Sequence, residues 1–179
     1  MAIKKTALYS SLWASCDELR GGMDASQYKD YVLTMLFMKF VSDKAKKQDA
    51  SFLLEVPEGA TFDDMVALKG DKEIGDKINK IISALAEEND LKGVIDVADF
   101  NDEDKLGKGK EMVDRLTKLI GLFEGLDLSA NRADGDDLLG DAYEYLMRHF
   151  ATESGKSKGQ FYTPAEVSRI IAKIVGVGA

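Results

Sequence analysis

Residues 31–41 read Tyr-Val-Leu-Thr-Met-Leu-Phe-Met-Lys-Phe-Val, and this stretch decides the fold class. It is apolar on nearly every side of a helix, which is typical of a helix that is buried on several faces. Its length and its lack of turn residues favour a helix over a strand. We therefore predict a long helix over residues 26–47 and place the core of the protein around it.

Helical spacing of apolar residues continues on both sides of this core helix. A first helix is predicted over residues 6–19, ended by the glycines at 21 and 22. A short helix is predicted over residues 61–68, where Thr61 and Asp64 have the spacing of a capping box. The fold class is therefore predicted to be mainly α.

The second half of the chain continues this pattern, with one acidic interruption. A long acidic loop with a short extended piece at 94–97 is predicted over residues 91–109, because regular apolar spacing is lost there. Apolar stripes over residues 78–86, 112–123 and 138–150 predict three amphipathic helices. A small, polar segment over residues 152–159 then predicts a hinge.

Charge and composition limit the classes of function. The chain carries 24 basic and 32 acidic side chains, a net charge of −8, whereas domains that bind nucleic acid non-specifically are usually basic. Any contact with DNA is therefore expected to be local or shared with more basic partners. Cys16 is the single cysteine, which excludes an internal disulfide and fits a reducing cytoplasm. No signal peptide and no membrane-spanning run are predicted, so the expected location is cytoplasmic.

Three patterns that suggest a catalytic or ligand site fail on closer reading. Gly155-Lys156-Ser157 lacks the earlier glycine of a phosphate loop, because Phe150 occupies that position. The acidic run over residues 99–104 lacks the glycine and the glutamate that a calcium loop requires at its sixth and twelfth positions. His149 has no cysteine or histidine cluster to join as a metal ligand. We predict no metal site and no catalytic residue in this chain.

A more specific pattern lies near the end of the chain, in Gly-Gln-Phe-Tyr-Thr-Pro over residues 159–164. Thr163 can cap a helix, Pro164 suits its first position, and Glu166 completes a capping box. Free N–H groups at such a helix start suit a carboxylate or a phosphate, and the two aromatic rings could pack on a flat or apolar ligand. Plain capping and core packing is the alternative interpretation. The basic side chains of Lys156, Lys158 and Arg148 lie nearby in sequence.

Three blocks of the sequence resemble one family, the modification (M) subunit of type I restriction-modification systems, a DNA adenine-N6 methyltransferase. The first block runs from Leu12-Trp13-Ala14 through residues 23–33 to residues 40–44. The second is Asp-Asp-Leu-Leu-Gly-Asp-Ala-Tyr-Glu-Tyr-Leu over residues 136–146. The third is the Gly-Gln-Phe-Tyr-Thr-Pro motif. The blocks occur in the family's order at both ends of the chain.

The resemblance implies a helical N-terminal domain over residues 1–155. Residues 156–179 would be the hinge and the start of an α/β methyltransferase domain that binds S-adenosylmethionine. By position, the residues lining the methionine side of the cofactor would be Gln160, Phe161, Tyr162, Thr163, Pro164 and Ala165. Implied partners are the specificity (S) subunit, a second M subunit, the restriction (R) subunit and double-stranded DNA, with no membrane. This region would serve subunit assembly and DNA engagement.

The sequence departs from the family pattern after Pro164. The family continues with a strand, a glycine-rich turn and an Asn-Pro-Pro-aromatic motif, but no Asn-Pro pair occurs here. We therefore expect an N-terminal fragment or a truncated subunit that does not methylate DNA alone. The alternatives are a stand-alone helical protein-interaction module and a truncated competitor of intact M subunits.

Overall fold

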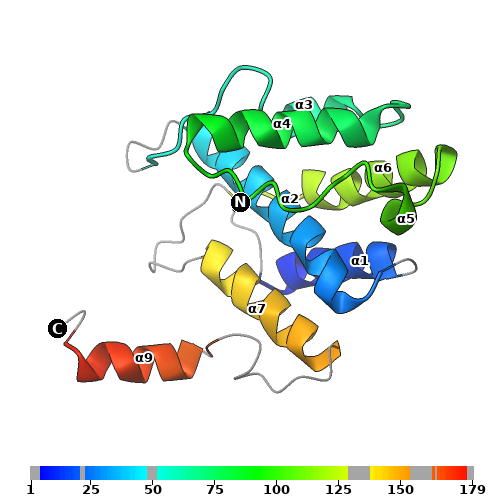
Figure 1. Ribbon diagram of the computed structural model, residues 1–179. Coiled ribbons are helices and arrows are strands. Elements are labelled where there is room, and N and C mark those ends of the chain that lie inside the picture. The colour runs from blue at the N-terminus through cyan, green and yellow to red at the C-terminus, as the bar shows by residue number, and fades with distance from the viewer. Residues whose placement is uncertain are drawn as a thin grey trace.

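The structure is a computed structural model that describes residues 5–20, 23–47, 52–128, 138–153, 163 and 165–176. Every regular element among these residues is a helix, and no strand occurs there, which confirms the mainly α prediction (Figure 1). The helices are α1 (Lys5–Arg20), α2 (Ala25–Lys46), α3 (Phe62–Ala67), α4 (Ile74–Glu88), α5 (Glu103–Leu106), α6 (Lys110–Glu124), α7 (Leu138–Glu153) and α9 (Ala165–Ile174).

Helix α2 is the core helix that the sequence predicts. It runs diagonally through the molecule and packs against α1, α3, α6 and α7 (Figure 1). Its apolar side chains are buried around most of its circumference, including Val32, Met35, Leu36 and Met38. Burying one such side chain contributes roughly 1.5–3 kcal/mol, so α2 supplies a large part of the hydrophobic stabilisation.

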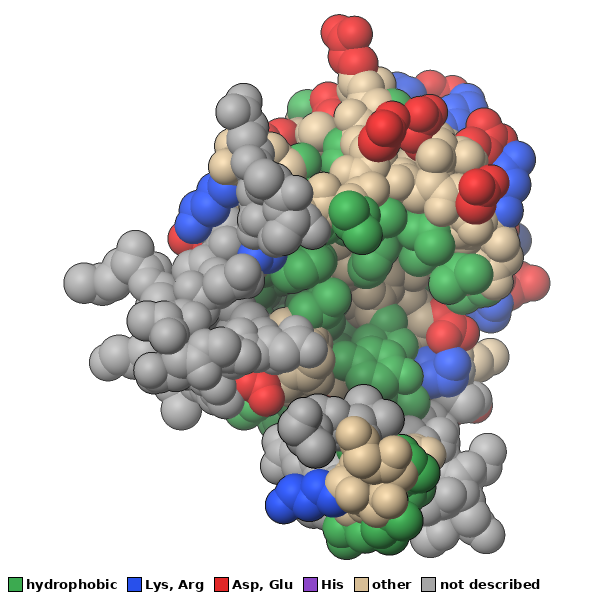
Figure 2. Space-filling view, turned by 90° about the vertical axis from the view of Figure 1, so that its left-hand side faces the viewer, with side chains coloured by type: hydrophobic (Ala, Val, Ile, Leu, Met, Phe, Trp, Pro, Cys, Tyr) green, Lys and Arg blue, Asp and Glu red, His purple; other side chains and the backbone are tan. Residues whose placement is uncertain are grey.

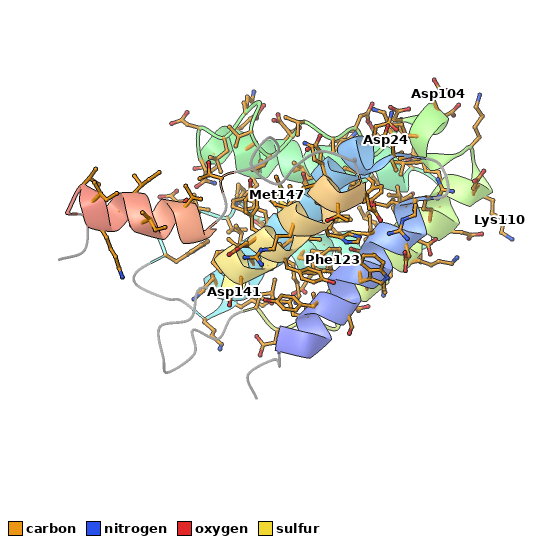
Figure 3. The ribbon with its side chains drawn as sticks, turned by 90° about the horizontal axis from the view of Figure 1, so that it is seen from below. Asp24, Asp104, Lys110, Phe123, Asp141 and Met147 are labelled. Carbon is orange, nitrogen blue, oxygen red and sulfur yellow. The ribbon has the colours of Figure 1, made fainter. Side chains whose placement is uncertain are left out.

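Helices α1, α6 and α7 cover one side of α2. The apolar stripe of α1, spaced by three or four residues, is fully buried and comprises Leu8, Leu12, Cys16 and Leu19. The ring of Tyr9 in α1 stacks on the ring of Tyr145 in α7, with centroids 4.2 Å apart. Figure 3 shows α1 and α7 side by side, so segments from the two ends of the chain pack together in one body.

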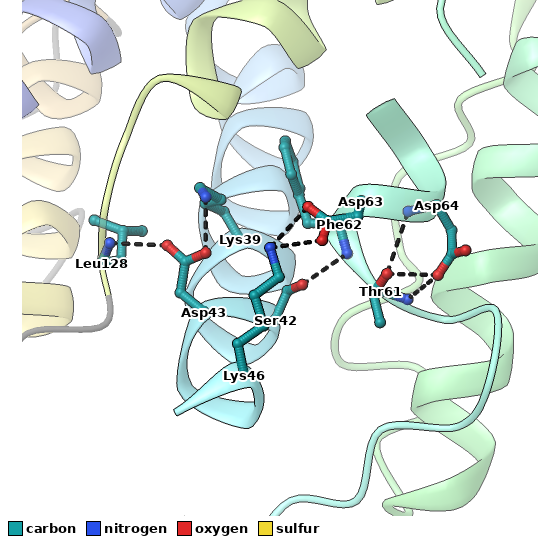
Figure 4. Close-up of polar contacts among 9 residues, drawn as sticks. All are labelled: Lys39, Ser42, Asp43, Lys46, Thr61, Phe62, Asp63, Asp64 and Leu128. Carbon is teal, nitrogen blue, oxygen red and sulfur yellow. Dashed lines mark hydrogen bonds and ion pairs between the residues drawn. The ribbon is translucent and has the colours of Figure 1, made fainter. Parts of the chain in front are cut away.

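The C-terminal half of α2 carries a buried ion pair. Lys39 Nζ donates to Asp43 Oδ1 at 2.7 Å, and both side chains are almost inaccessible to solvent. The other carboxylate oxygen of Asp43 accepts the backbone N–H of Leu128 at 2.9 Å (Figure 4). Ser42 directly precedes Asp43, and its hydroxyl accepts the N–H of Phe62 at 3.1 Å. These polar side chains attach two other chain segments to α2.

The predicted capping box at the start of α3 is confirmed. The Thr61 hydroxyl accepts the N–H of Asp64 at 3.2 Å, and the Asp64 carboxylate accepts the N–H of Thr61 at 2.9 Å (Figure 4). The hydrogen bonds from Thr61 hold the pKa of Asp64 below its usual value. Capping thus fixes the direction in which the chain enters α3.

Replacing Thr61 by alanine is expected to lower the free energy of unfolding by about 1 kcal/mol, the usual cost of losing such a cap. Because the pKa of Asp64 is depressed in the folded state, its contribution is present above the unfolded-state pKa and is lost as the pH falls through the folded value. Urea unfolding at pH 7 and pH 3 checks both effects. Equal stability of the two proteins at pH 7 would contradict the expected cost of losing the cap. An equal loss of stability in both proteins between pH 7 and pH 3 would contradict the expected contribution of Asp64.

The segment after α4 differs from the predicted acidic loop. Residues 94 and 95 form a turn and a bend, and residues 96 and 97 are irregular, so the predicted extended piece does not form a strand. A short helix, α5, follows because the Asp102 carboxylate accepts the N–H groups of Asp104 and Lys105. Four apolar side chains of this segment are buried in the core: Ile95, Ala98, Phe100 and Leu106. Apolar side chains without helical spacing therefore still contribute to the core.

Helix α9 stands apart from the other helices (Figure 1). Its range agrees with the predicted helix after Thr163. Among the residues that the structure describes, no helix is both long and apolar enough to cross a membrane.

Candidate cofactor-binding site

The predicted cofactor segment is described only in part. Gln160, Phe161, Tyr162 and Pro164 lie outside the described residues, as do Lys156 and Lys158. Thr163 is described and exposed, and it lies two positions before Ala165, the first residue of α9. Thr163 is the one polar residue of the predicted segment that the structure describes, and the N-terminus of the ten-residue helix α9 follows it. This arrangement fits a ligand carboxylate, because helix N-termini present free N–H groups and a partial positive charge.

The apolar stripe of α9 and of the turn that follows it is exposed. Its exposed side chains are Val167, Ile170, Ile171, Ile174 and Val175. Such spacing at every third or fourth residue is typical of a helix that packs on a larger apolar surface. The exposed stripe of α9 is therefore available to pack on a further apolar surface.

Arg148, the third basic residue near this segment in sequence, lies on α7. Its guanidinium donates to Glu144 Oε1 through Nε at 3.0 Å and through Nη2 at 2.5 Å. This bond joins two residues one turn apart on the same helix. Arg148 thus has an intrahelical acidic partner, and the structure does not bring it to Thr163.

The sequence does not predict a cluster that the structure forms between α1 and α7. His149 lies edge-on to Trp13 with ring centroids 3.8 Å apart, and the Arg20 guanidinium carbon lies 5.0 Å from the Trp13 ring centroid. Arg20 also pairs with Glu153 at 2.6 Å. His149 lies four residues before the end of α7 and is half-buried.

Burial lowers the pKa of His149, and the positive charge of Arg20 lowers it further. Glu153 Oε1 lies 3.2 Å from His149 Nε2 and would favour the charged ring, yet Nε2 makes no hydrogen bond there. We give burial and Arg20 more weight, because an unaligned contact stabilises the imidazolium poorly. His149 is therefore neutral at pH 7 and joins two helices.

Stability is expected to fall on mild acidification because of His149. Its folded-state pKa is depressed, so below about pH 6.5 the unfolded chain binds the proton first and becomes favoured. Replacing His149 by phenylalanine keeps the aromatic contact with Trp13 and removes the titration. Urea unfolding at pH 7.5 and pH 5.5 should show a larger loss for the natural protein than for the variant. A gain in stability of the natural protein at pH 5.5 would mean that pairing with Glu153 prevails.

The acidic run over residues 99–104 is engaged in local hydrogen bonds. Asp99 accepts the side-chain amide of Asn79 at 2.7 Å and the N–H of Asn101 at 2.8 Å. Asp102 caps α5, and its hydrogen bond with Lys105 holds the pKa of Asp102 below its usual value. Within the described ranges, no group of three or more His, Cys, Asp or Glu side chains is placed to hold a metal ion.

The surroundings of Cys16 make its thiol unreactive. It is fully buried in the stripe of α1, and burial raises its pKa to about 12. The negative charge of nearby Glu153 is the second cause of this raised pKa, after burial. The reactive thiolate is therefore scarce at neutral pH.

Two family models match the chain in succession. The model described as the HsdM N-terminal domain matches residues 8–123, which include α1 to α6. The chain belongs to the HsdM N-terminal domain family. A second model, N-6 DNA Methylase, matches residues 134–178, which include α7, the predicted cofactor segment and α9. The predicted family resemblance is thus confirmed over most of the chain.

Curated relatives of this HsdM-family chain are methylase subunits of type I restriction enzymes. The MpnII methylase subunit of Mycoplasma pneumoniae is 24% identical over an alignment that covers 96% of this chain and 40% of the relative. The EcoKI methylase subunit of Escherichia coli is 28% identical over 94% of this chain and 30% of the relative. The chain therefore spans less than half the length of these relatives.

A solved structure shares the fold of this HsdM-family chain. The type I restriction-modification system methyltransferase subunit from Streptococcus thermophilus superimposes with a TM-score of 0.77 and 24% sequence identity. The superposition covers 98% of this chain and 44% of that chain. This likeness concerns the fold, a helical N-terminal domain followed by the start of a methyltransferase domain.

Proposed function

We propose that the chain is the N-terminal part of a subunit that transfers a methyl group from S-adenosylmethionine to adenine N6 in DNA. The observation that carries this proposal is the succession of the two family matches, over residues 8–123 and 134–178. The first region supplies most of the helical body, and the second contains α7, the last helix of that body, followed by the start of the catalytic domain. We place the boundary between these units at residues 155 and 156, where the polar hinge follows α7.

The methionine carboxylate of the cofactor is assigned to the start of α9. The exposed Thr163, two positions before the first residue of α9, supports this assignment, because its hydroxyl and the free N–H groups of the helix can bind an anion. Phe161 and Tyr162 would pack against the apolar part of the cofactor. S-adenosylmethionine supplies the electrophilic methyl group when bound. The residues of this chain would bind and orient it.

The helical body would serve subunit assembly and DNA engagement in the cytoplasm. We assign as partners the specificity subunit, a second modification subunit, the restriction subunit and double-stranded DNA. The net charge of −8 supports a shared contact with DNA, because an acidic domain gains little from phosphate neutralisation by itself. Sequence recognition is therefore assigned to the specificity subunit.

The activity is tested on the complete subunit assembled with its specificity subunit. Transfer of a radiolabelled methyl group to duplex DNA should be detectable, with N6-methyladenine as the product after digestion. Replacing Tyr162 by alanine should weaken S-adenosylmethionine binding about tenfold, the scale of one lost aromatic contact. The control is Leu53→Ala, which removes an exposed apolar side chain and should leave binding unchanged. Absence of methyl transfer by the natural complex would refute the proposed reaction.

Residues 1–179 by themselves should bind neither ligand tightly. Calorimetry is expected to show no binding of S-adenosylmethionine, because the matched part of the catalytic domain ends shortly after α9. Duplex DNA should bind weakly and in a salt-sensitive way. Micromolar binding of the cofactor to this chain would contradict the expectation that its binding site is incomplete. Tight DNA binding at physiological salt would contradict the expectation, based on net charge, that the chain binds DNA weakly.

A further inference from the structure

A groove lies between α2, the segment over residues 91–97 and α7, and we call it the α2–α7 groove. Its volume is about 620 Å³. Its apolar lining includes Leu33 and Phe37 from α2, Val94 and Val97 from the segment, and Leu139 and Tyr143 from α7. Figure 2 shows a hollow with mainly hydrophobic walls in the middle of one face of the molecule, with acidic side chains above it.

The rim of the groove is unusually apolar for a surface. Val94 is 64% exposed, Val97 is 56% exposed and Tyr143 is 47% exposed. Single exposed apolar residues are common, but three of them around one apolar hollow form a contiguous patch. Such patches on soluble proteins mark protein–protein contacts, membrane contacts or ligand-binding grooves.

The groove is formed before anything binds to it. The Thr34 hydroxyl of α2 donates to the carbonyl of Ile95 at 3.1 Å, and both groups are buried. The Tyr31 hydroxyl donates to the carbonyl of Asp99 at 2.9 Å. The first bond holds the segment over residues 91–97 against α2, and the second holds the chain two residues after it, so the exposed valines lie on a wall that is attached to α2.

The chemistry of the groove favours an apolar protein surface over a charged ligand. Asp30 is the charged residue of the described lining, and its carboxylate already pairs with Lys29 at 2.6 Å. The other polar side chains of the described lining are Thr34, whose hydroxyl already donates to Ile95, and Tyr143. A partner would therefore gain mainly from burying apolar surface, at roughly 25 cal/mol per Å².

The position of the groove indicates which surface covers it. Two of its walls lie in the region matched by the HsdM N-terminal model, whereas α7 lies in the region matched by the N-6 DNA methylase model. The exposed stripe of α9 lies below the groove on the same face (Figure 2). The relatives extend well beyond the region that this chain matches.

We propose that the α2–α7 groove is the seat of the methyltransferase domain of the same polypeptide, on the helical body. This inference rests on the proposed function, which supplies that domain. The domain would continue from α9, so it is tethered close to the groove. Tethering raises the effective concentration to the millimolar range, and a contact of modest area then suffices to hold the two parts together.

Alkylation of an introduced cysteine tests the proposal. Val97→Cys places a thiol on the exposed rim, in the complete subunit and in residues 1–179. Its reaction rate with N-ethylmaleimide is measured by mass spectrometry of the peptide that contains position 97. We expect the rate to be at least tenfold lower in the complete subunit. The matched control is Lys110→Cys at the exposed start of α6, far from α9 (Figure 3), which should react equally in both proteins.

Cys16 gives an internal check of folding, because it is buried and should stay unreactive in every protein. Equal reaction rates at position 97 in both proteins would overturn the proposal. A low rate in residues 1–179 that rises on dilution would also overturn it, because a second copy of the chain would then cover the groove. If the complete subunit methylates DNA while position 97 stays reactive, the inference alone fails. If the natural complex does not methylate DNA, the proposed function fails.

Discussion

Replacing Asp43 by alanine is expected to lower the free energy of unfolding by about 3–5 kcal/mol, the usual cost of removing one partner from a buried ion pair. The substitution leaves the Lys39 ammonium unpaired, although that side chain is only 8% exposed. It also removes the acceptor of the Leu128 N–H, which is bonded at 2.9 Å in the folded protein. Since domains of this size are stable by about 5–15 kcal/mol, a large share of the total would be lost.

A surface ion pair close by gives the control for Asp43. Lys46 pairs with Asp63 at 2.6 Å between two well-exposed side chains (Figure 4). Replacing Asp63 by alanine should cost at most about 1 kcal/mol, because solvent screens exposed pairs and their ordering costs entropy. Urea unfolding of both variants, with the midpoint and slope fitted separately, checks the contrast. Similar losses for Asp43→Ala and Asp63→Ala would contradict a special role for burial.

Replacing Gly75 by alanine is expected to destabilise the protein by about 1–3 kcal/mol, the usual cost of overpacking. Gly75 lies in the first turn of α4, and a Cβ there would overlap the carbonyl oxygen of Phe100. It would also lie 3.0 Å from Asn101 Cα, so backbone rather than a flexible side chain is in the way.

The neighbouring segment has little freedom to move away from Gly75. The Phe100 N–H donates to Asn79 Oδ1 at 2.9 Å, and the Phe100 ring packs edge-on against Tyr31 with centroids 5.1 Å apart. A shift of Phe100 to admit a methyl group would weaken both contacts. We therefore expect the clash to outweigh the gain in helix propensity from glycine to alanine.

Gly121 in α6 is the matched control, because a Cβ there meets nothing within 4 Å. Its replacement by alanine should stabilise the protein by about 0.5–1 kcal/mol, since glycine inside a helix loses more backbone entropy. Thermal and urea unfolding should thus shift in opposite directions for the two variants. Stabilisation by Gly75→Ala would show that α4 and the segment over residues 100–101 separate easily.

Several features of the fold follow from local patterns. The all-round apolar run over residues 31–41 predicted the central helix, and its observed bounds, Ala25–Lys46, differ by one residue at each end. Thr61 and Asp64 predicted a capping box that the structure contains. These predictions succeed because helix periodicity and capping depend on residues within one or two turns of each other.

The candidate site was predictable to the same extent. The capping pattern of Thr163, Pro164 and Glu166 predicted the helix α9, and the motif over residues 159–164 is one of the three blocks behind the family resemblance that the comparisons confirm. The roles of Gln160 to Ala165 in binding the cofactor stay a prediction. Those roles depend on parts of the catalytic domain that a local pattern does not contain.

The amino-acid sequence alone was enough for the helical class, the central helix, the caps and the family. Tertiary structure was needed to bring Asp43 to the Leu128 N–H, His149 to Trp13 and the residues 91–97 to α2. These contacts join groups that are 61 to 136 positions apart in the sequence, and no local sequence pattern predicts such a pairing. They form only when burial of the shared apolar core brings distant segments together, because that burial offsets the entropy lost in closing long loops.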